Sequence, residues 1–111
     1  MVDITHKITT LRTAVAQAIV KVGSPKTIQA ILDKTVPKGD VLSVAKTAGL
    51  FAVKNTSNAI PDCHPMPIEF TGIEFECLTD SIQIEVTVKT IYKTGVEVEA
   101  MHGASIVALT M

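Results

Sequence analysis

The feature that most constrains the fold of this chain is a strict alternation of apolar and polar residues near its C-terminal third. The apolar members are Ile82, Ile84, Val86 and Val88, and the polar members are Gln83, Glu85, Thr87 and Lys89. Successive side chains of a β-strand point to opposite faces, so the pattern predicts a strand that is buried on one face only. One-sided burial is typical of an antiparallel sheet.

Two more segments are expected to join this strand, which we place at residues 82–92. Residues 68–78 form a hairpin with it through Thr79-Asp80-Ser81. Residues 10–22 read as an extended segment whose more apolar face is expected to look inward. That face carries Arg12, Ala14, Ala16, Ala18, Val20 and Val22.

Three helices are predicted between and after the strands. Ser24-Pro25 opens a short one, Asp40 caps one over residues 41–54, and a third begins after Lys93-Thr94-Gly95. The order β-α-α-β-β-α predicts an α+β fold with helices packed on one face of an antiparallel sheet. The last helix is still apolar at Met111 without a cap signal, so we expect one domain, 1–111, that is interrupted at its C-terminus.

The longer helices each carry a stripe of small residues, which lets another backbone approach closely. The stripes are Ala45, Ala48, Gly49 and Ala52, then Ala100, Gly103, Ala104, Val107 and Ala108. Hydrophobic residues make up 47% of this short chain of 111 residues. A short chain buries less of its surface, so we expect leftover apolar faces to make contacts in a homo-oligomer.

Charge and composition narrow the class of function. The formal net charge is −1 without a basic run, which argues against a nucleic-acid partner. The longest apolar stretch, residues 41–53, is interrupted by Lys46 and is too short for a bilayer, so no membrane role is expected. The polar N-terminus shows no signal peptide, and the two cysteines form no disulfide framework, so we expect a cytoplasmic protein.

Three short segments could carry chemistry. In Lys38-Gly39-Asp40, a lysine precedes a helix N-terminus, where an anion would be favoured; a solvated lysine beside a capping aspartate is the simpler interpretation. In Asp62-Cys63-His64-Pro65, the histidine could exchange protons near neutral pH, or could simply bond to backbone. A metal site here lacks further Cys and His partners, and Cys63 lacks an orienting carboxylate for a nucleophile.

The third segment contains Glu97 and Glu99, where the last strand passes into the final helix. Two carboxyl groups in a small space push one pKa up, which makes one a candidate acid and the other a base. Acidic residues at a helix start also compensate the helix dipole, and that explanation needs no ligand. His102, one turn after Glu99, is interpreted as its surface partner and is given no role.

Taken in order, these segments resemble the cyclic pyranopterin monophosphate synthase (MoaC) family from end to end. The matching strings are Met1-Val2-Asp3-Ile4, Leu11-Arg12-Thr13-Ala14, Pro37-Lys38-Gly39-Asp40-Val41, Ala45-Lys46-Thr47-Ala48-Gly49-Leu50, Ile60-Pro61-Asp62-Cys63-His64-Pro65, Lys93-Thr94-Gly95-Val96-Glu97-Val98-Glu99-Ala100 and Ser105-Ile106-Val107-Ala108-Leu109-Thr110.

The resemblance implies a lyase of molybdenum cofactor biosynthesis. Such an enzyme converts a cyclised dihydro-GTP, (8S)-3',8-cyclo-7,8-dihydroguanosine 5'-triphosphate, into cyclic pyranopterin monophosphate and releases pyrophosphate. It also implies a ferredoxin-like α+β domain, no cofactor or metal, and a hexamer built as a trimer of dimers with active sites between subunits.

Site residues follow from the same resemblance. Lys38, His64, Glu97 and Glu99 match catalytic positions. Asp62, Cys63, His64, Val98 and Glu99 match substrate-contacting positions, and Arg12 and Lys54 match basic positions suited to the triphosphate. We therefore expect the segments around Lys38, His64 and the two glutamates to converge into one cationic cleft, completed by a neighbouring subunit.

The chain departs from the family pattern in two places. Asp62 stands where leucine is more common, and with Ala100-Met101-His102-Gly103 it looks like fused forms that carry a molybdopterin adenylyltransferase-type domain. The family also continues past Thr110 with an essential Asp and Lys, a last strand and a glycine-rich tail. The alternative to the lyase is therefore a truncated, non-catalytic assembly or ligand-binding module; a metal-dependent enzyme using Cys63 and His64 is more distant.

Overall fold

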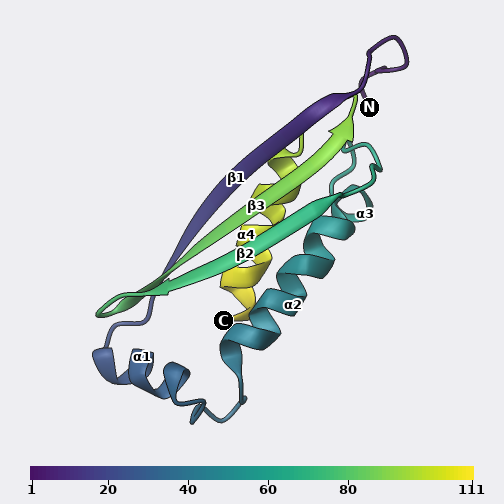
Figure 1. The fold of residues 1–111 in the computed structure, drawn as a ribbon. Helices are drawn as coiled ribbons and strands as arrows, with labels where there is room; N and C mark the ends of the chain where they lie inside the picture. The colour runs from purple at the N-terminus through teal and green to yellow at the C-terminus, as the bar shows by residue number, and fades with distance from the viewer.

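A three-stranded antiparallel sheet runs along the molecule, with its strands in the order β1-β3-β2. The strands are β1 (Thr10–Lys21), β2 (Phe70–Cys77) and β3 (Ser81–Tyr92). They form the front layer of Figure 1. This computed structural model describes all 111 residues and measures 53 × 21 × 19 Å.

The alternation in β3 is confirmed as the basis of the core. Ile82, Ile84, Val86 and Val88 are all 0% exposed, whereas Glu85 and Lys89 on the opposite face are exposed. Because β3 is central, its register sets the faces of both neighbours. Ala14, Ala16, Ala18 and Val20 of β1 share its buried side, as predicted, and pack against the same core.

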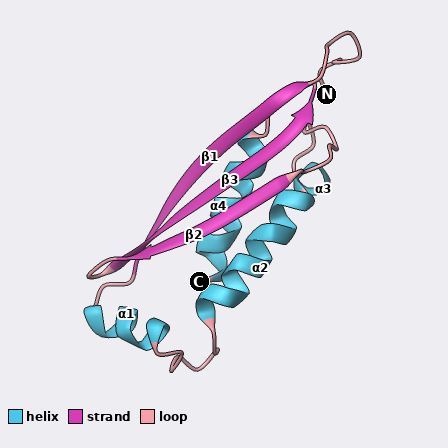
Figure 2. Cartoon of the chain, viewed as in Figure 1, coloured by secondary structure: helices cyan, strands magenta, loops and turns pink.

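Two long helices cover that buried face, as predicted: α2 (Val41–Lys54) and α4 (Glu97–Thr110). Figure 2 shows α4 passing behind the strands and α2 running alongside β2. α4 lies against β1 and β3, while α2 lies against β2 and α4. The short helix α1 (Pro25–Leu32) lies beyond one end of the sheet, where Ile28 and Ile31 pack with Val41 and Ile82. α3 (Thr56–Ala59), a single turn after α2, was not predicted.

The two small-residue stripes pack against each other within one chain. A Cβ on Gly49 would clash with Val107 and approach the carbonyl oxygen of Gly103 to 3.5 Å; a Cβ on Gly103 would lie 2.7 Å from Val53 Cγ2. The absence of side chains therefore allows α2 and α4 to cross closely. The helix crossing within one chain therefore accounts for both stripes.

The predicted helix starts are confirmed by their capping contacts. The Ser24 hydroxyl accepts from Lys26 N–H at 3.2 Å, and the Asp40 carboxylate accepts from Ser43 N–H at 3.1 Å. Gly23 and Gly39 have φ values of 76° and 85°, a left-handed conformation that glycine adopts without strain. Both glycines are thus explained by the backbone turns that precede α1 and α2.

The architecture is an α+β fold of the ferredoxin-like type, as the sequence led us to expect. The face of the sheet opposite the helices exposes several large apolar side chains: Leu11, Val15, Ile19, Phe70 and Ile91. No helix in the structure combines the length and apolarity that crossing a membrane requires.

Candidate functional site

Three segments from distant parts of the sequence meet at the end of the sheet that holds the N-terminus. They are residues 1–7 (the strap), residues 60–67 (the CHP loop) and the β3–α4 connection with the first turn of α4. Together they enclose a cavity of about 320 Å³ (the cleft). Its lining residues are Val2, Ile4, Lys7, Asp62, Cys63, His64, Met66, Thr94, Gly95, Glu97, Val98 and Glu99.

The CHP loop is fixed to the sheet at its far end. The hydroxyl of Thr90, which is fully buried in β3, donates to the carbonyl oxygen of Pro67. A tight turn also forms where Cys63 N–H donates to Ile60 carbonyl oxygen at 3.1 Å. With three prolines restricting its backbone, the loop presents consecutive side chains to the cleft from a defined position.

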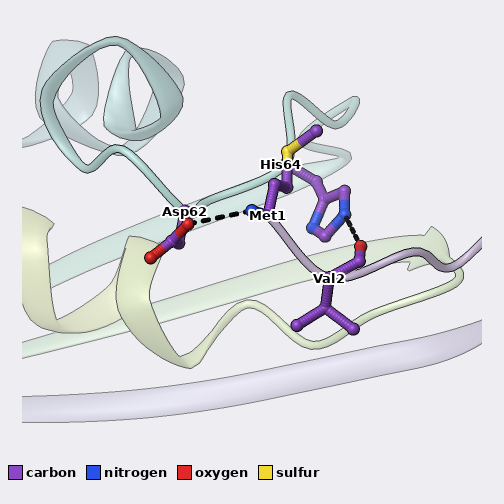
Figure 3. Close-up of polar contacts among 4 residues, drawn as sticks. All are labelled: Met1, Val2, Asp62 and His64. Atoms are coloured by element: carbon purple, nitrogen blue, oxygen red, sulfur yellow. Dashed lines mark hydrogen bonds and ion pairs between the residues drawn. The ribbon is translucent and has the colours of Figure 1, made fainter.

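His64 joins the CHP loop to the strap. Its Nε2 lies 2.7 Å from the carbonyl oxygen of Val2, and Figure 3 shows the ring directed at that oxygen. A carbonyl oxygen can only accept, so Nε2 carries a hydrogen and Nδ1 is the ring nitrogen left for proton exchange with a ligand. Beside it, the Asp62 carboxylate lies 3.1 Å from the amino group of Met1, which offsets the additional negative charge at this position.

Glu97 and Glu99 occupy the first turn of α4 and both line the cleft. Glu97 is exposed, whereas Glu99 is only 3% exposed. Burial is the main reason that the pKa of Glu99 is raised, and the neighbouring Glu97 adds to the effect. Glu99 therefore retains its proton to a higher pH than an ordinary glutamate, as a candidate acid requires. A Cβ on Gly95 would meet the Glu97 carboxylate, so glycine leaves room for that group.

Cys63 lines the cleft as a protonated thiol. Burial raises its pKa, and Glu99 and Asp62 raise it further by opposing a negative charge on sulfur. This arrangement is the reverse of the cationic surroundings that activate nucleophilic cysteines. Cys63 can contact a ligand, but these surroundings disfavour the thiolate that nucleophilic attack would require.

Lys7 is the only lysine or arginine that lines the cleft, and no motif in the sequence pointed to it. The strap is bonded to two other segments of the chain. Lys93 Nζ donates to Thr5 carbonyl oxygen at 3.3 Å, and His64 Nε2 donates to Val2 carbonyl oxygen at 2.7 Å. The first contact joins residues that are 88 positions apart in the chain, and the second joins residues that are 62 positions apart. Local sequence patterns do not reveal contacts over such separations.

Two predicted basic residues lie beside the cleft, not in its lining. Lys54, at the end of α2, lines a small hollow of about 10 Å³ that shares His64 and Glu99 with the cleft. Arg12, on β1, reaches the carbonyl oxygen of Lys93 through Nη2 at 3.5 Å, and its Nε is buried without a partner. Lys54 thus borders the site, and Arg12 supports the segment that leads into α4.

Lys38 lies at the opposite end of the molecule. Its ammonium donates at 2.8 Å to the carbonyl oxygens of Thr110 and Met111, at the C-terminal end of α4. The glutamates are at the other end of that 14-residue helix, about 20 Å away at 1.5 Å per residue. One chain therefore does not bring Lys38 together with His64, Glu97 and Glu99.

The N-terminus of α2 was considered above as an anion site, but the carboxylate of Asp40 already binds there. Asp40 caps the helix and pairs with Lys34 at 3.0 Å, and these two contacts hold the pKa of Asp40 below its usual value, with Lys34 the larger cause. Lys38 lines a separate, mainly apolar cavity of about 360 Å³ with Val20, Val22, Thr27, Ile31, Val36, Pro37, Val41 and Met111.

His102 was expected to pair with Glu99, and this was wrong. Its Nδ1 lies 3.0 Å from the hydroxyl oxygen of Thr56, a fully buried residue that also contacts the carbonyl oxygen of Ala52 at 3.0 Å. The histidine thus joins α4 to the α2–α3 junction.

The chain gathers no group of three or more His, Cys, Asp or Glu side chains suited to a metal ion.

The fold and the cleft together define a ferredoxin-like α+β domain in which a histidine and two glutamates line one cavity, side chains of a kind that can exchange protons. The comparison with known families is specific. The sequence matches the MoaC family over residues 1–111, and the chain belongs to that family.

Relatives from distant organisms match the whole chain. A protein of Clostridium perfringens (strain SM101 / Type A), named cyclic pyranopterin monophosphate synthase, is 48% identical over 113 residues, covering 100% of this chain and 71% of its own length. A Geotalea uraniireducens protein of the same name is 49% identical, with 100% and 70% covered. A probable synthase of Sulfurisphaera tokodaii is 45% identical, with 100% and 73% covered.

Proposed function

We propose that this chain is a cyclic pyranopterin monophosphate synthase domain, a lyase of molybdenum cofactor biosynthesis. Its substrate would be the cyclised dihydro-GTP, (8S)-3',8-cyclo-7,8-dihydroguanosine 5'-triphosphate, and its products cyclic pyranopterin monophosphate and pyrophosphate. The observation that carries the proposal is one cleft lined by His64, Glu97 and Glu99, in a chain whose relatives over its full length bear that name.

The chemistry of the reaction suits these groups. Opening the tricyclic substrate and closing the pyranopterin require protons to be delivered and removed at several atoms. His64 offers Nδ1 for this work, buried Glu99 can deliver a proton, and exposed Glu97 can accept one. Asp62, Cys63 and Val98 would contact the substrate, because they line the same space.

Release of pyrophosphate requires positive charge near the leaving group, and the cleft of one chain carries little. We propose that Lys38 of a second copy completes it, and that Lys54 and Arg12 contribute from its border. The support is the separation of Lys38 from the glutamates by the length of α4. Cations placed in a partly dry cleft stabilise developing negative charge more strongly than cations in water.

Assembly follows from the same reasoning. We propose a hexamer, a trimer of dimers, with active sites between subunits. The side of the sheet that the helices leave uncovered carries exposed apolar side chains, including Val15 and Ile19. A second copy of the chain could cover this surface. Light scattering on the purified protein would measure the oligomer, and a monomer at micromolar concentration would contradict this part of the proposal.

A cytoplasmic location, consistent with two free cysteines, belongs to the same proposal.

The function is tested by pyrophosphate release from the cyclised dihydro-GTP. Glu99→Gln and Lys38→Ala should each lose most activity. When the two variants are unfolded and refolded together, mixed dimers should contain one cleft with both residues intact, and activity should partly return. No turnover by the unaltered chain would contradict the lyase and favour the non-catalytic binding module. Turnover without recovery in the mixture would contradict only the shared site.

A further inference from the structure

Lys7 occupies an unusual position among the charged groups of the cleft. It is the only lysine or arginine in the lining, which also contains the carboxyl groups of Asp62, Glu97 and Glu99. A ligand with phosphate groups would meet net negative charge there unless a cation faced it. The cleft of a single chain therefore has one side chain able to attract such a ligand directly.

The ammonium group of Lys7 is not used by the fold. It makes no hydrogen bond and no ion pair in the structure, although three carboxyl groups line the same cleft. Three other lysines are engaged: Lys38 with two carbonyl oxygens, Lys93 with Thr5 and Lys34 with Asp40. The charge of Lys7 is thus available to a ligand without breaking an existing contact.

The backbone that carries Lys7 is nevertheless fixed. The strap turns on itself, with Lys7 N–H donating to Ile4 carbonyl oxygen at 3.1 Å and Thr5 N–H donating to Asp3 Oδ1 at 2.9 Å. The carbonyl oxygen of Val2 is bonded to His64, which lines the cleft, and that of Thr5 is bonded to Lys93, which directly precedes the lining residues Thr94 and Gly95. Fixing the backbone before binding reduces the entropy lost when the side chain meets a ligand.

We infer that Lys7 is a substrate-binding residue that holds a phosphate group of the ligand, and that the strap is the wall of the cleft that places it there. The assignment rests on the proposed function for the identity of the ligand, but only on the geometry of the cleft for the choice of residue. Lys7 binds the anion and positions it, and the proton transfers remain with His64 and the two glutamates.

The test compares Lys7→Ala, Lys7→Arg and a matched control, Lys26→Ala, which removes an exposed lysine from α1 at the other end of the molecule. Inorganic pyrophosphate is the probe for binding by calorimetry, and the cyclised dihydro-GTP is the substrate for turnover. Loss of one charge-assisted contact should weaken pyrophosphate binding about 10-fold or more and raise KM similarly, with a smaller change in kcat. Lys7→Arg should recover most of the affinity, and added salt should weaken binding less in Lys7→Ala than in the unaltered protein.

Three outcomes would overturn the assignment: unchanged pyrophosphate affinity and KM in Lys7→Ala, an equal loss in Lys26→Ala, or no pyrophosphate binding by the unaltered protein. Failure of the proposed function looks different, because the unaltered protein then gives no turnover of the cyclised dihydro-GTP whatever the Lys7 variants do. Turnover with an unchanged KM in Lys7→Ala removes only the role of Lys7.

Discussion

Gly49 and Gly103 face each other where α2 crosses α4: a Cβ on Gly49 would lie 3.5 Å from the carbonyl oxygen of Gly103, and the reverse distance is 3.7 Å. This crossing holds α4, and with it the first-turn glutamates, against the rest of the core. The positions of Glu97 and Glu99 thus depend on two residues that have no side chains.

We expect Gly49→Ala to destabilise the protein by about 1–2 kcal/mol, although alanine is the better helix former. The added Cβ would press on Val107 and lie 2.9 Å from Ile73 Cδ1, both buried and unable to move freely. Urea unfolding measures the change, with Lys46→Ala on the exposed side of the same helix as the control. A gain in stability would show that α2 and α4 separate easily.

Glu99→Gln should raise stability at neutral pH while it lowers turnover. The pKa of Glu99 is raised in the folded state, so folding binds a proton and its favourable contribution is complete below the pKa of the unfolded glutamate. That contribution is lost as pH rises through the folded pKa. The stability advantage of the variant over the parent should therefore grow from about pH 4 upward. Unfolding curves between pH 4 and 8 measure it; a constant difference would contradict the raised pKa.

The Cys63 thiol should react slowly at neutral pH. Because burial and two carboxyl groups raise its pKa, alkylation by iodoacetamide should develop at a higher pH in the folded protein than in urea. A Cys77→Ala background leaves Cys63 as the sole reporter. Full reactivity at pH 7 in the folded state would mean that a cation acts on the sulfur.

Lys38→Ala should lower turnover far more than stability. The side chain is exposed and its two bonds are to carbonyl oxygens at a helix end, so its removal should cost about 1 kcal/mol or less. Thermal unfolding beside the pyrophosphate assay separates the two effects, with Lys26→Ala as the reference. Parallel losses of both properties would make Lys38 a structural residue.

Glu85→Gln should stabilise the protein by about 0.5 kcal/mol at low salt, because Glu74 and Glu85 are direct cross-strand partners of like charge. Glu76→Gln is the matched control, since Glu76 faces Gln83. The difference between the variants should shrink as salt screens the repulsion. An increase with salt would contradict the electrostatic explanation.

The sheet and the helix starts could be predicted because their causes are local. Alternation over residues 82–89 sets which side of β3 is buried, and the side chains of Ser24 and Asp40 satisfy backbone N–H groups of the helices that follow. Residues 56–59, which form α3, contain no apolar periodicity that would predict a helix.

The candidate site was predictable only in part. His64, Glu97 and Glu99 were identified from residue type and family pattern, and the fold does bring them together. The neighbourhood of Lys7 depends on hydrogen bonds between the strap and residues 64 and 93, and the remoteness of Lys38 depends on the length of α4. Both are properties of the three-dimensional arrangement and leave no periodic signal.

The strap is bonded to the rest of the chain through the carbonyl oxygens of Val2 and Thr5, and none of its residues belongs to the buried core. The segment that we propose to hold the anion and the segments that form the core are thus different stretches of the polypeptide. Residues 1–7 could therefore be exchanged to change which anion is accepted. The sheet and its two long helices would keep the contacts that form the core.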